Sequence, residues 1–468
     1  MKLNRNLLRI GLAPLAFCTL LAAASNSMRA AEPETTKTKG EAFIVGTDAP
    51  LASVASFSVT IESIDAYAAG STTPVPLLSS PAANVDFARF NGLQTLLDIN
   101  QVPVGSYDKI VITISSPNLG YLTTTAGMPP AIQYMTPTLT TSTVTKHLLD
   151  PLTVTAAEPI GLRMDFDLHK SIEVEKGQIT GTVDPVFTIG VVRPTAPGAY
   201  IDEFDTAVVS PDPGNQTFTV QGPHGRFWTI DTNGQTAWDG GTFASLNANT
   251  IVQISGELDR STSTITADEV SILSQNGFWA GGQLTYAWPS TSTGGSFDLF
   301  VRGLLPASGT GVKLGQIATV DLTSTDKYFV RWSGVRLPES VSSLIFNPSA
   351  LVPGQSIGVG GPSSGATDED AVTVKRVTLR EWGYVGTVVK GSVKPAKDTF
   401  QMKVDGFAGQ LIPQTINVYL TGRTEFRYGY SGIRTISGGD LVRVVGLLLK
   451  DPATGDTILV GKYVDALD

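Results

Sequence analysis

The sequence predicts an all-β protein, with an N-terminal β-sandwich followed by three small tandem β-barrel modules. Glycine and proline are abundant, with 48 and 28 residues among 468, while only 16% of residues are charged. That mixture is typical of short strands joined by many turns. Apolar residues also recur at every second position in many short segments, as they do in strands with one buried face. No segment shows the sustained periodicity of a long amphipathic helix.

Length and charge limit the class of protein further. A chain of 468 residues, of which 41% are hydrophobic, is too long for one compact core and can bury several. The net charge is −9, and no basic stripe of the kind that binds nucleic acid is present. The sequence therefore predicts a multidomain protein that does not bind nucleic acid.

The first 31 residues read as a signal peptide. Three basic residues precede an apolar run from Ile10 to Ala24, and small residues follow up to a cleavage site at Ala30 or Ala31, with Ala24 as an alternative. No other stretch reaches the roughly 18 apolar residues of a membrane span. We therefore expect an exported chain, periplasmic, cell-surface or extracellular, whose mature form has no transmembrane segment.

The single cysteine lies inside this apolar run. Cys18 follows Phe17 rather than the small residue that precedes a lipidated cysteine, which argues against lipoprotein anchoring. Its removal with the signal peptide would leave a mature chain without disulfides, held together by packing alone. Residues 32–39 are polar and are expected to form a tether.

Residues 40–195 are predicted to form the β-sandwich. The segment 53–67 alternates apolar and polar residues with one slip, as a long strand with a bulge does. Further strands are expected within 84–117, 161–172 and 181–194, separated by Pro- and Gly-rich turns. Several such short strands in succession are typical of two packed sheets.

The remaining sequence repeats an order of elements loosely. Each unit contains a strand, a Gly turn, a strand that ends in Gly, a hairpin and a closing strand. A five-stranded closed or nearly closed barrel, OB-like, would bury one face of strands this short. The predicted barrel modules are 196–273, 274–380 and 381–468.

Several of these segments resemble known families. "GTDAP" (46–50), "NVDFARFNG" (84–92) and "LRMDFDLHKSI" followed by "VDPVFTI" occur in one order. Together they resemble the bacterial domain of unknown function 4382, a secreted β-sandwich family, over about residues 40–192. The repeats from about residue 198 are similar to the domain of unknown function 5666, a small β-barrel module. Neither resemblance implies an established activity.

The stretch "GLRMDFDLHKSI" (161–172) holds two aspartates and a histidine. If it is a strand, Asp165 and Asp167 lie on the face opposite Leu162, Met164 and Phe166. The simplest interpretation is a polar strand face whose carboxylates accept hydrogen bonds from neighbouring segments.

A calcium site is the alternative for the same aspartates. Two carboxylates at i and i+2 stand roughly 7 Å apart, and a calcium ion needs six to eight oxygen ligands. Asp48 and Asp86 lie in turn-like sequence, so the candidate ligands are Asp48, Asp86, Asp165 and Asp167. Zinc is less well supported, because the three histidines show no pair at ligand spacing.

Aromatic residues form the second candidate site. The segments 278–289 and 380–386 contain several aromatic side chains. They either fill barrel cores and junctions or form an exposed platform for a glycan or a peptide. The candidate ligand-binding residues are Trp279, Tyr286, Trp288, Trp382 and Tyr384.

Catalytic motifs find little support. "GPSSG" (361–365) matches G-x-S-x-G formally, but no histidine follows Ser363 and no helix pattern adjoins it.

We therefore expect an exported non-catalytic multidomain β-protein that acts by binding or structural presentation at the bacterial cell envelope or outside the cell. Its partners would be envelope glycans or other secreted proteins. The alternatives are an extracytoplasmic polysaccharide hydrolase with an unrecognised carboxylate pair, and a calcium-stabilised structural module. No cofactor other than calcium is expected.

Overall fold

A computed structural model describes most of the chain after residue 37. The described residues are 38–90, 93, 95–124, 128–193, 200–221, 227–258, 264–275, 277–289, 294–306, 311–331, 346–362, 371–406 and 411–467. The predicted signal peptide and most of the tether lie outside them, as do residues 363–370, which include Ser363. Within the described residues the chain is all-β, as predicted: its one α-helix, α1 (Leu168–Ser171), has four residues.

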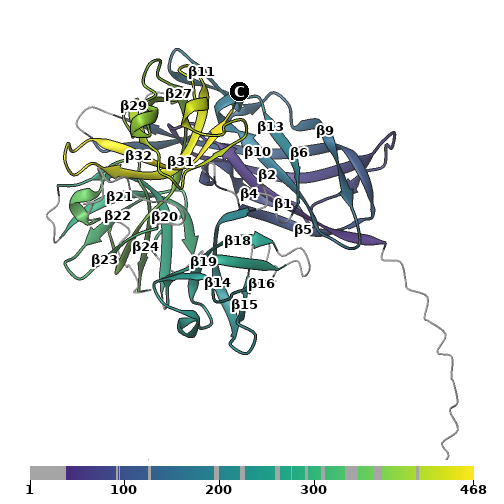
Figure 1. Cartoon of the computed structure of the whole chain (residues 1–468), viewed down its shortest axis with the longest axis horizontal. Coiled ribbons are helices and arrows are strands. Elements are labelled where there is room, and N and C mark those ends of the chain that lie inside the picture. Colours follow the sequence, from purple (N-terminus) through teal and green to yellow (C-terminus); the bar gives the residue numbers. More distant parts are fainter. Residues whose placement is uncertain are drawn as a thin grey trace, which may run out of the picture. The chain divides into compact units, whose positions relative to one another are not determined.

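The sandwich domain, residues 39–192, pairs two sheets over one apolar core (Figure 1). The first sheet has the order β13-β10-β1-β5, with strands β1 (Lys39–Ala49), β5 (Thr95–Pro103), β10 (Ile160–Asp167) and β13 (Phe187–Val192). The second has the order β3-β2-β6-β7, with β4 beside β2 and β9 beside β6. Its strands are β2 (Val54–Ala68), β3 (Val75–Pro76), β4 (Ala82–Asp86), β6 (Gly105–Thr123), β7 (Ala131–Met135) and β9 (Thr143–Val154). A small third sheet contains β8 (Thr138–Leu139), β11 (Ile172–Glu175) and β12 (Gln178–Val183).

The first sheet of the sandwich is buried on both faces. One face, with Ile44, Leu162 and Phe166, packs on the second sheet. The other face, with Phe43 and Val45, joins a separate apolar cluster shared with the next module. A sheet covered on both sides carries near-continuous apolar strands, and β1 and β10 are buried along almost their whole length.

Modules 1 and 3 are closed five-stranded rings. In module 1 the ring runs β14-β15-β16-β19-β18 and back to β14. Its strands are β14 (Tyr200–Asp212), β15 (Thr217–Gln221), β16 (Phe227–Asp231), β18 (Ile251–Leu258) and β19 (Ile265–Ser274). In module 3 the ring runs β27-β28-β29-β32-β31 and back to β27. Its strands are β27 (Trp382–Val388), β28 (Thr399–Val404), β29 (Thr415–Tyr419), β31 (Leu441–Lys450) and β32 (Thr457–Ala466).

Module 2 has the same order, with its closing strand in two pieces. Its strands are β20 (Phe278–Ala287), β21 (Gly295–Leu305), β22 (Ile317–Leu322), β24 (Ser356–Gly361), β25 (Ala371–Thr373) and β26 (Arg376–Arg380). β25 pairs with β22, and β26 pairs with β24, so the two consecutive pieces complete the ring.

A short extra strand and a single 3-10 turn recur at the same place in every module. The short strands β17 (Ala237–Asp239), β23 (Lys327–Val330) and β30 (Glu425–Arg427) each pair in parallel with the closing strand. The turns η4 (Phe243–Ser245), η6 (Pro348–Ala350) and η8 (Ile433–Thr435) follow them. The loose sequence repetition thus corresponds to one order of elements that occurs three times.

Glycines mark the bulges of these barrels. The register of β31 against β32 shifts at Val445/Gly446, and that of β18 against β19 shifts at Ser255/Gly256. A Cβ at Gly446 would lie 2.0 Å from the carbonyl oxygen of Val460, and one at Gly256 would lie 2.2 Å from that of Thr266. Only glycine therefore allows the two backbones to approach this closely.

Substitution of Gly446 with alanine is expected to destabilise module 3 by about 1–3 kcal/mol, because a methyl group must displace backbone rather than a side chain. Gly422→Ala is the matched control, since nothing lies within 4 Å of a Cβ built there. Thermal unfolding of both variants tests this prediction. Equal midpoints for the two would show that the close approach in β31 carries no cost.

Apolar clusters also join the modules to one another. Leu447 and Leu449 of β31 belong to the core cluster of module 2. Trp279 of module 2 clusters with Ile251 and Leu273 of module 1. Residues Thr38–Asp468 accordingly form one compact unit. No helix in the described part of the chain is long and apolar enough to cross a membrane.

Candidate functional site

Charged side chains are buried where the sandwich domain and the three modules meet. Each projects from a strand, or from the residue that follows one, and at most 5% of its surface is exposed. The five cations are Arg302 (β21), Arg331 (after β23), Arg380 (β26), Arg443 (β31) and Lys462 (β32). A charge buried this deeply is stable only when it is paired and hydrogen-bonded. We call these cations and their carboxylate partners the junction network.

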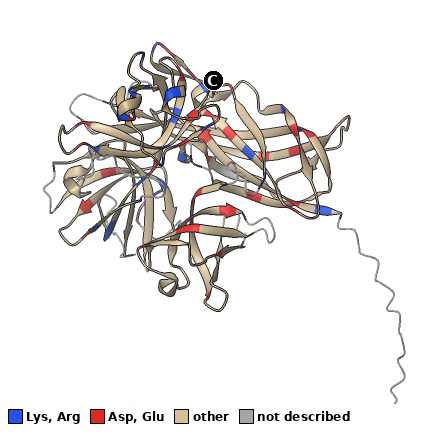
Figure 2. Ribbon diagram, in the orientation of Figure 1, with Lys and Arg blue, Asp and Glu red and all other residues tan. Residues whose placement is uncertain are grey.

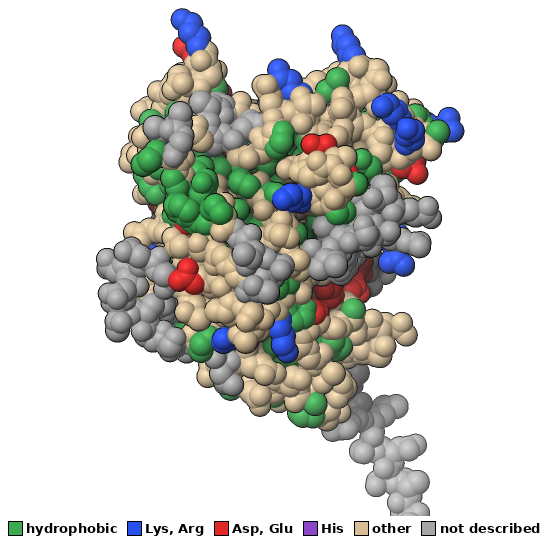
Figure 3. All heavy atoms as spheres, turned by 90° about the vertical axis from the view of Figure 1, so that its left-hand side faces the viewer, with side chains coloured by type: hydrophobic (Ala, Val, Ile, Leu, Met, Phe, Trp, Pro, Cys, Tyr) green, Lys and Arg blue, Asp and Glu red, His purple; other side chains and the backbone are tan. Residues whose placement is uncertain are grey.

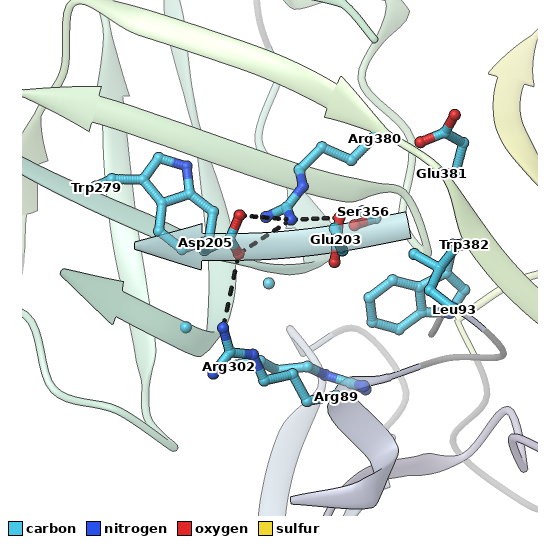
Figure 4. A pocket seen from close by; sticks show the side chains of 13 residues that line it. Arg89, Leu93, Glu203, Asp205, Trp279, Arg302, Ser356, Arg380, Glu381 and Trp382 are labelled. Carbon is cyan, nitrogen blue, oxygen red and sulfur yellow. Dashed lines mark hydrogen bonds and ion pairs between the residues drawn. The ribbon is translucent and has the colours of Figure 1, made fainter. Parts of the chain in front are cut away.

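Arg380 links module 2 to module 1. Its guanidinium pairs with Glu203 and with Asp205, the latter at 3.2 Å. Arg89 of the sandwich domain lies 3.6 Å from Asp205 and approaches it from the other side (Figure 4). Asp205 also accepts a hydrogen bond of 2.7 Å from the Gln253 amide. Three parts of the chain therefore share one carboxylate.

Arg331 occupies the centre of the network. Its guanidinium donates to the Asp202 carbonyl oxygen at 3.0 Å and to the Ser255 hydroxyl. Carboxylate oxygens of Glu203, Glu269 and Glu381 lie 3.8 to 3.9 Å from its nitrogens. This arrangement surrounds one cation with several acids, so loss of the cation would leave those acids facing each other.

Lys462 and Tyr463 bring module 3 into the same network. The Lys462 ammonium lies 3.6 Å from carboxylate oxygens of both Asp202 and Glu381. The Tyr463 hydroxyl donates to Asp202 at 3.0 Å. Burial alone would lower the pKa of Lys462, but Glu381 and Asp202 outweigh it and raise that pKa above its ordinary value.

Arg443 joins module 3 to the sandwich domain. It donates to Asp465 at 2.9 Å, to Asp165 at 3.1 Å and to the Asp48 carbonyl oxygen at 2.8 Å. Arg427 holds the other oxygen of Asp465 at 2.8 Å. Although burial alone would raise the pKa of Asp465, Arg443 and Arg427 keep it below its ordinary value.

The network is complementary in charge between modules. The segment 196–273 contains ten acidic and two basic residues, and both of the latter, Arg226 and Arg260, lie outside the described residues. Figure 2 shows the contrast between this module and its neighbours. The cations that neutralise its buried acids come from modules 2 and 3. Complementary charge of this kind favours the correct partner surface over others.

Burial shifts the pKa of two further groups. It raises the pKa of Glu203 above its ordinary value, a shift that Arg380 partly offsets. It lowers the pKa of Arg302 to about 10, so this side chain remains charged at neutral pH. Arg302 donates to the Val54 carbonyl oxygen and to the Gln283 side chain, each at 3.3 Å.

A narrow pocket opens into the network between Arg89, Glu203, Asp205, Trp279 and Trp382. The cavity has a volume of only about 20 Å³. That space suits about one water molecule. The lining of the pocket contains three carboxylates and two indole rings, but a sugar ring does not fit.

The four aspartates predicted as calcium ligands have other partners. Asp165 accepts from Arg443, and Asp86 accepts from the Phe57 backbone N–H at 2.8 Å. Asp167 caps α1 by accepting from the Lys170 N–H at 2.9 Å, and Asp48 is fully buried. The described residues contain no group of three or more acids, histidines or cysteines placed to hold a metal. The calcium site remains a prediction.

The predicted strand 161–172 ends earlier than expected. β10 stops at Asp167, whose side chain caps α1, so His169 lies on this short helix rather than on the strand. Its Nε2 contacts an Asp405 carboxylate oxygen of module 3 at 2.9 Å. The alternation rule failed here because the helix cap replaced the last strand residues. His169 consequently joins two domains.

This contact predicts a pH-dependent contribution to stability. The hydrogen bond to Asp405 raises the pKa of His169 above its ordinary value. A raised folded-state pKa stabilises the fold fully below the unfolded value, about 6.5, and the gain is lost as the pH rises through the folded value. With 28% of the His169 side chain exposed, we expect at most about 1 kcal/mol.

Unfolding of His169→Gln against the unsubstituted chain, across a pH series, measures this contribution. The difference should be largest in mild acid and should shrink above neutrality. His147→Gln is the control, since His147 lies exposed on β9. A difference that grows with rising pH would contradict the assignment.

The five candidate aromatic residues fall into two groups. Trp279, Trp382 and Tyr384 are buried at the junction. The Arg380 guanidinium lies 4.8 Å from the centre of the Trp279 ring, and that of Arg302 lies 4.4 Å from Trp382. The Tyr384 hydroxyl donates to the Gly354 carbonyl oxygen at 2.8 Å. Tyr286 and Trp288 lie at the surface, where 39% of Trp288 is exposed.

Sequence reasoning missed the buried cations, although a signal for them exists. β31 reads "LVRVVGLLLK" and is apolar at both alternating sets of positions. A strand of that kind is buried on both faces, so a lone arginine within it requires a buried partner. The same reasoning applies to Arg302 in "FDLFVRGLL" and to Lys462 in "TILVGKYVDA".

Comparison with known proteins confirms the first resemblance, and confirms the second for module 1. Residues 41–182, most of the sandwich domain, match the model of a Domain of unknown function (DUF4382). Residues 206–271 in module 1 match that of another Domain of unknown function (DUF5666). No curated protein matches the chain. The chain thus consists of a sandwich domain that matches DUF4382 and three barrel modules. Of these modules, module 1 matches DUF5666.

Proposed function

We propose that the protein is exported and acts without catalysis, by binding or presenting a preassembled surface at the cell envelope or outside the cell. The junction network is the observation that carries this proposal. Its ion pairs join the sandwich domain and all three modules. Breaking such buried pairs is costly, so the modules hold their surfaces in one arrangement. A preassembled surface loses less conformational freedom on binding than flexibly linked modules do.

The state of the acidic residues also favours binding over catalysis. A glycosidase needs two carboxylates with room between them for a sugar or a water nucleophile. Glu203 and Asp205 are instead occupied by Arg380, and the adjoining pocket has space for about one water molecule. These carboxylates are best understood as the anionic half of an interface between modules.

Retention of the purified full chain on immobilised envelope polysaccharides and on secreted proteins tests the proposal. Binding to one class, without turnover of any glycan, is the expected result. Absence of retention on every surface would count against it. Turnover of a polysaccharide that Glu203→Gln or Asp205→Asn abolishes would establish the hydrolase alternative instead.

A further inference from the structure

The outer surface of module 2 carries a fixed pair of aromatic rings. Tyr286 of β20 lies opposite Asp298 of β21, which lies opposite Thr319 of β22. Paired residues share a face of a sheet, and the intervening Phe297 and Val320 point into the barrel core. Trp288 follows two residues after Tyr286. The aromatic, carboxylate and hydroxyl groups therefore share the outer face of the barrel.

Trp288 is held in place from both its backbone and its side chain. Its backbone N–H donates to the Ser296 carbonyl oxygen at 3.1 Å, and its indole Nε1–H donates to Asp298 Oδ1 at 3.2 Å. The Thr319 hydroxyl donates to the same oxygen at 2.8 Å. Asp298 is itself buried, with 7% of its surface exposed. A ring fixed in this way loses little freedom when a ligand covers it.

Tyr286 completes the arrangement. Its ring stands edge-to-face against Trp288, with centroids 4.9 Å apart and an interplanar angle of 75°. A single exposed aromatic residue would need no explanation. Two rings in a fixed mutual geometry, one of them anchored by a buried carboxylate, form a prepared binding surface.

The surrounding groups indicate the chemistry of the ligand. Both hydrogen bonds to Asp298 end on Oδ1, and no contact among the described residues occupies Oδ2. A ligand that suits this surface offers an apolar face to the indole and hydroxyl donors at its edge. A pyranose ring has C–H groups on its face and hydroxyls at its edge, whereas an apolar peptide side chain lacks the donors.

We propose that Trp288 stacks against a pyranose ring of a polysaccharide, with Tyr286 holding the indole ring edge-to-face and Asp298 as an acceptor for the sugar hydroxyls. This inference rests on the proposed binding function and names its ligand class. Figure 3 shows one face of the molecule, on which hydrophobic side chains gather in a patch with single charged side chains beside it.

Affinity electrophoresis of the purified full chain in gels containing laminarin, xylan, amylose or dextran tests the site, with calorimetry on the polysaccharide that retards it. Trp288→Ala should weaken binding roughly tenfold or more, which corresponds to about 1.4 kcal/mol. Phe227→Ala in module 1 removes another exposed ring, 60% exposed, and should leave binding unchanged.

Asp298→Asn keeps an acceptor for the indole but removes the negative charge, so it separates folding from recognition. It should bind several-fold more weakly while unfolding at nearly the temperature of the unsubstituted chain. Equal polysaccharide binding by Trp288→Ala and the unsubstituted chain would overturn this inference and leave the proposed function standing. Binding to a secreted protein but to no polysaccharide would do the same. Retention on neither class would overturn both.

Discussion

Replacing Arg443 with alanine is expected to destabilise the chain by roughly 3–5 kcal/mol, the cost of removing one partner from a buried ion pair. The substitution removes the cation between Asp465 and Asp165 and the donor to the Asp48 carbonyl oxygen. Arg427 still compensates Asp465, but Asp165 loses its cation. Since folded domains are stable by only about 5–15 kcal/mol, this is a large fraction of the total.

Urea unfolding, together with hydrogen exchange in β1, β10 and β31, measures the effect. Arg423→Ala is the matched control, because Arg423 lies exposed in the same module and should shift stability by less than about 0.5 kcal/mol. Exchange should accelerate where module 3 meets the sandwich domain. Equal stability of the two variants would mean that the Arg443 pairs contribute nothing net.

Replacing Arg380 with alanine should release module 1 from its neighbours, at a cost of about 3–5 kcal/mol. Among the described residues, Glu203 then keeps the more distant Arg331, at 3.8 Å. Burial already raises the pKa of Glu203, and loss of Arg380 should raise it further. The folded form would then take up a proton that the unfolded form lacks, so the deficit should be greater at pH 8 than at pH 5.

Arg376 provides a matched comparison on the same strand. It pairs with Asp239 of module 1, the module that Arg380 also contacts, but 13% of the arginine side chain and 35% of the aspartate are exposed. Arg376→Ala should therefore cost no more than about 1 kcal/mol. Hydrogen exchange in β14 distinguishes the two variants. Equal losses at both sites would show that burial does not determine the strength of these pairs.

The sandwich strands were largely readable from the sequence. In 161–167 the alternation placed Leu162, Met164 and Phe166 correctly in the core. It placed Asp165 and Asp167 on the opposite face, which is correct, but it could not show that this face is covered. Arg443, which is 278 residues away from Asp165 in the sequence, covers this face. A contact between residues so far apart produces no recognisable pattern in the sequence around either residue.

The aromatic residues show the same limit. The segment 278–289 contains Trp279, Tyr286 and Trp288, which composition cannot tell apart. A glycine accommodates Trp279. A Cβ at Gly281 would lie 2.4 Å from the Trp279 ring, so the indole packs directly against the glycine backbone at the junction. Trp288 instead hydrogen-bonds to Asp298 and remains partly exposed at the surface. The packing partners of each ring therefore distinguish the buried Trp279 from the partly exposed Trp288 of the candidate site.

The links made by Arg443 also constrain the order in which the chain can mature. It reaches back 395 residues to the Asp48 carbonyl oxygen, and Lys462 reaches back to Asp202. A growing polypeptide therefore carries the carboxylates of Asp165 and Asp202 without these counter-charges until β31 and β32 have been synthesised. Termination upstream of β31 would leave both carboxylates without these cations, so synthesis of these two strands is a condition for the assembled form.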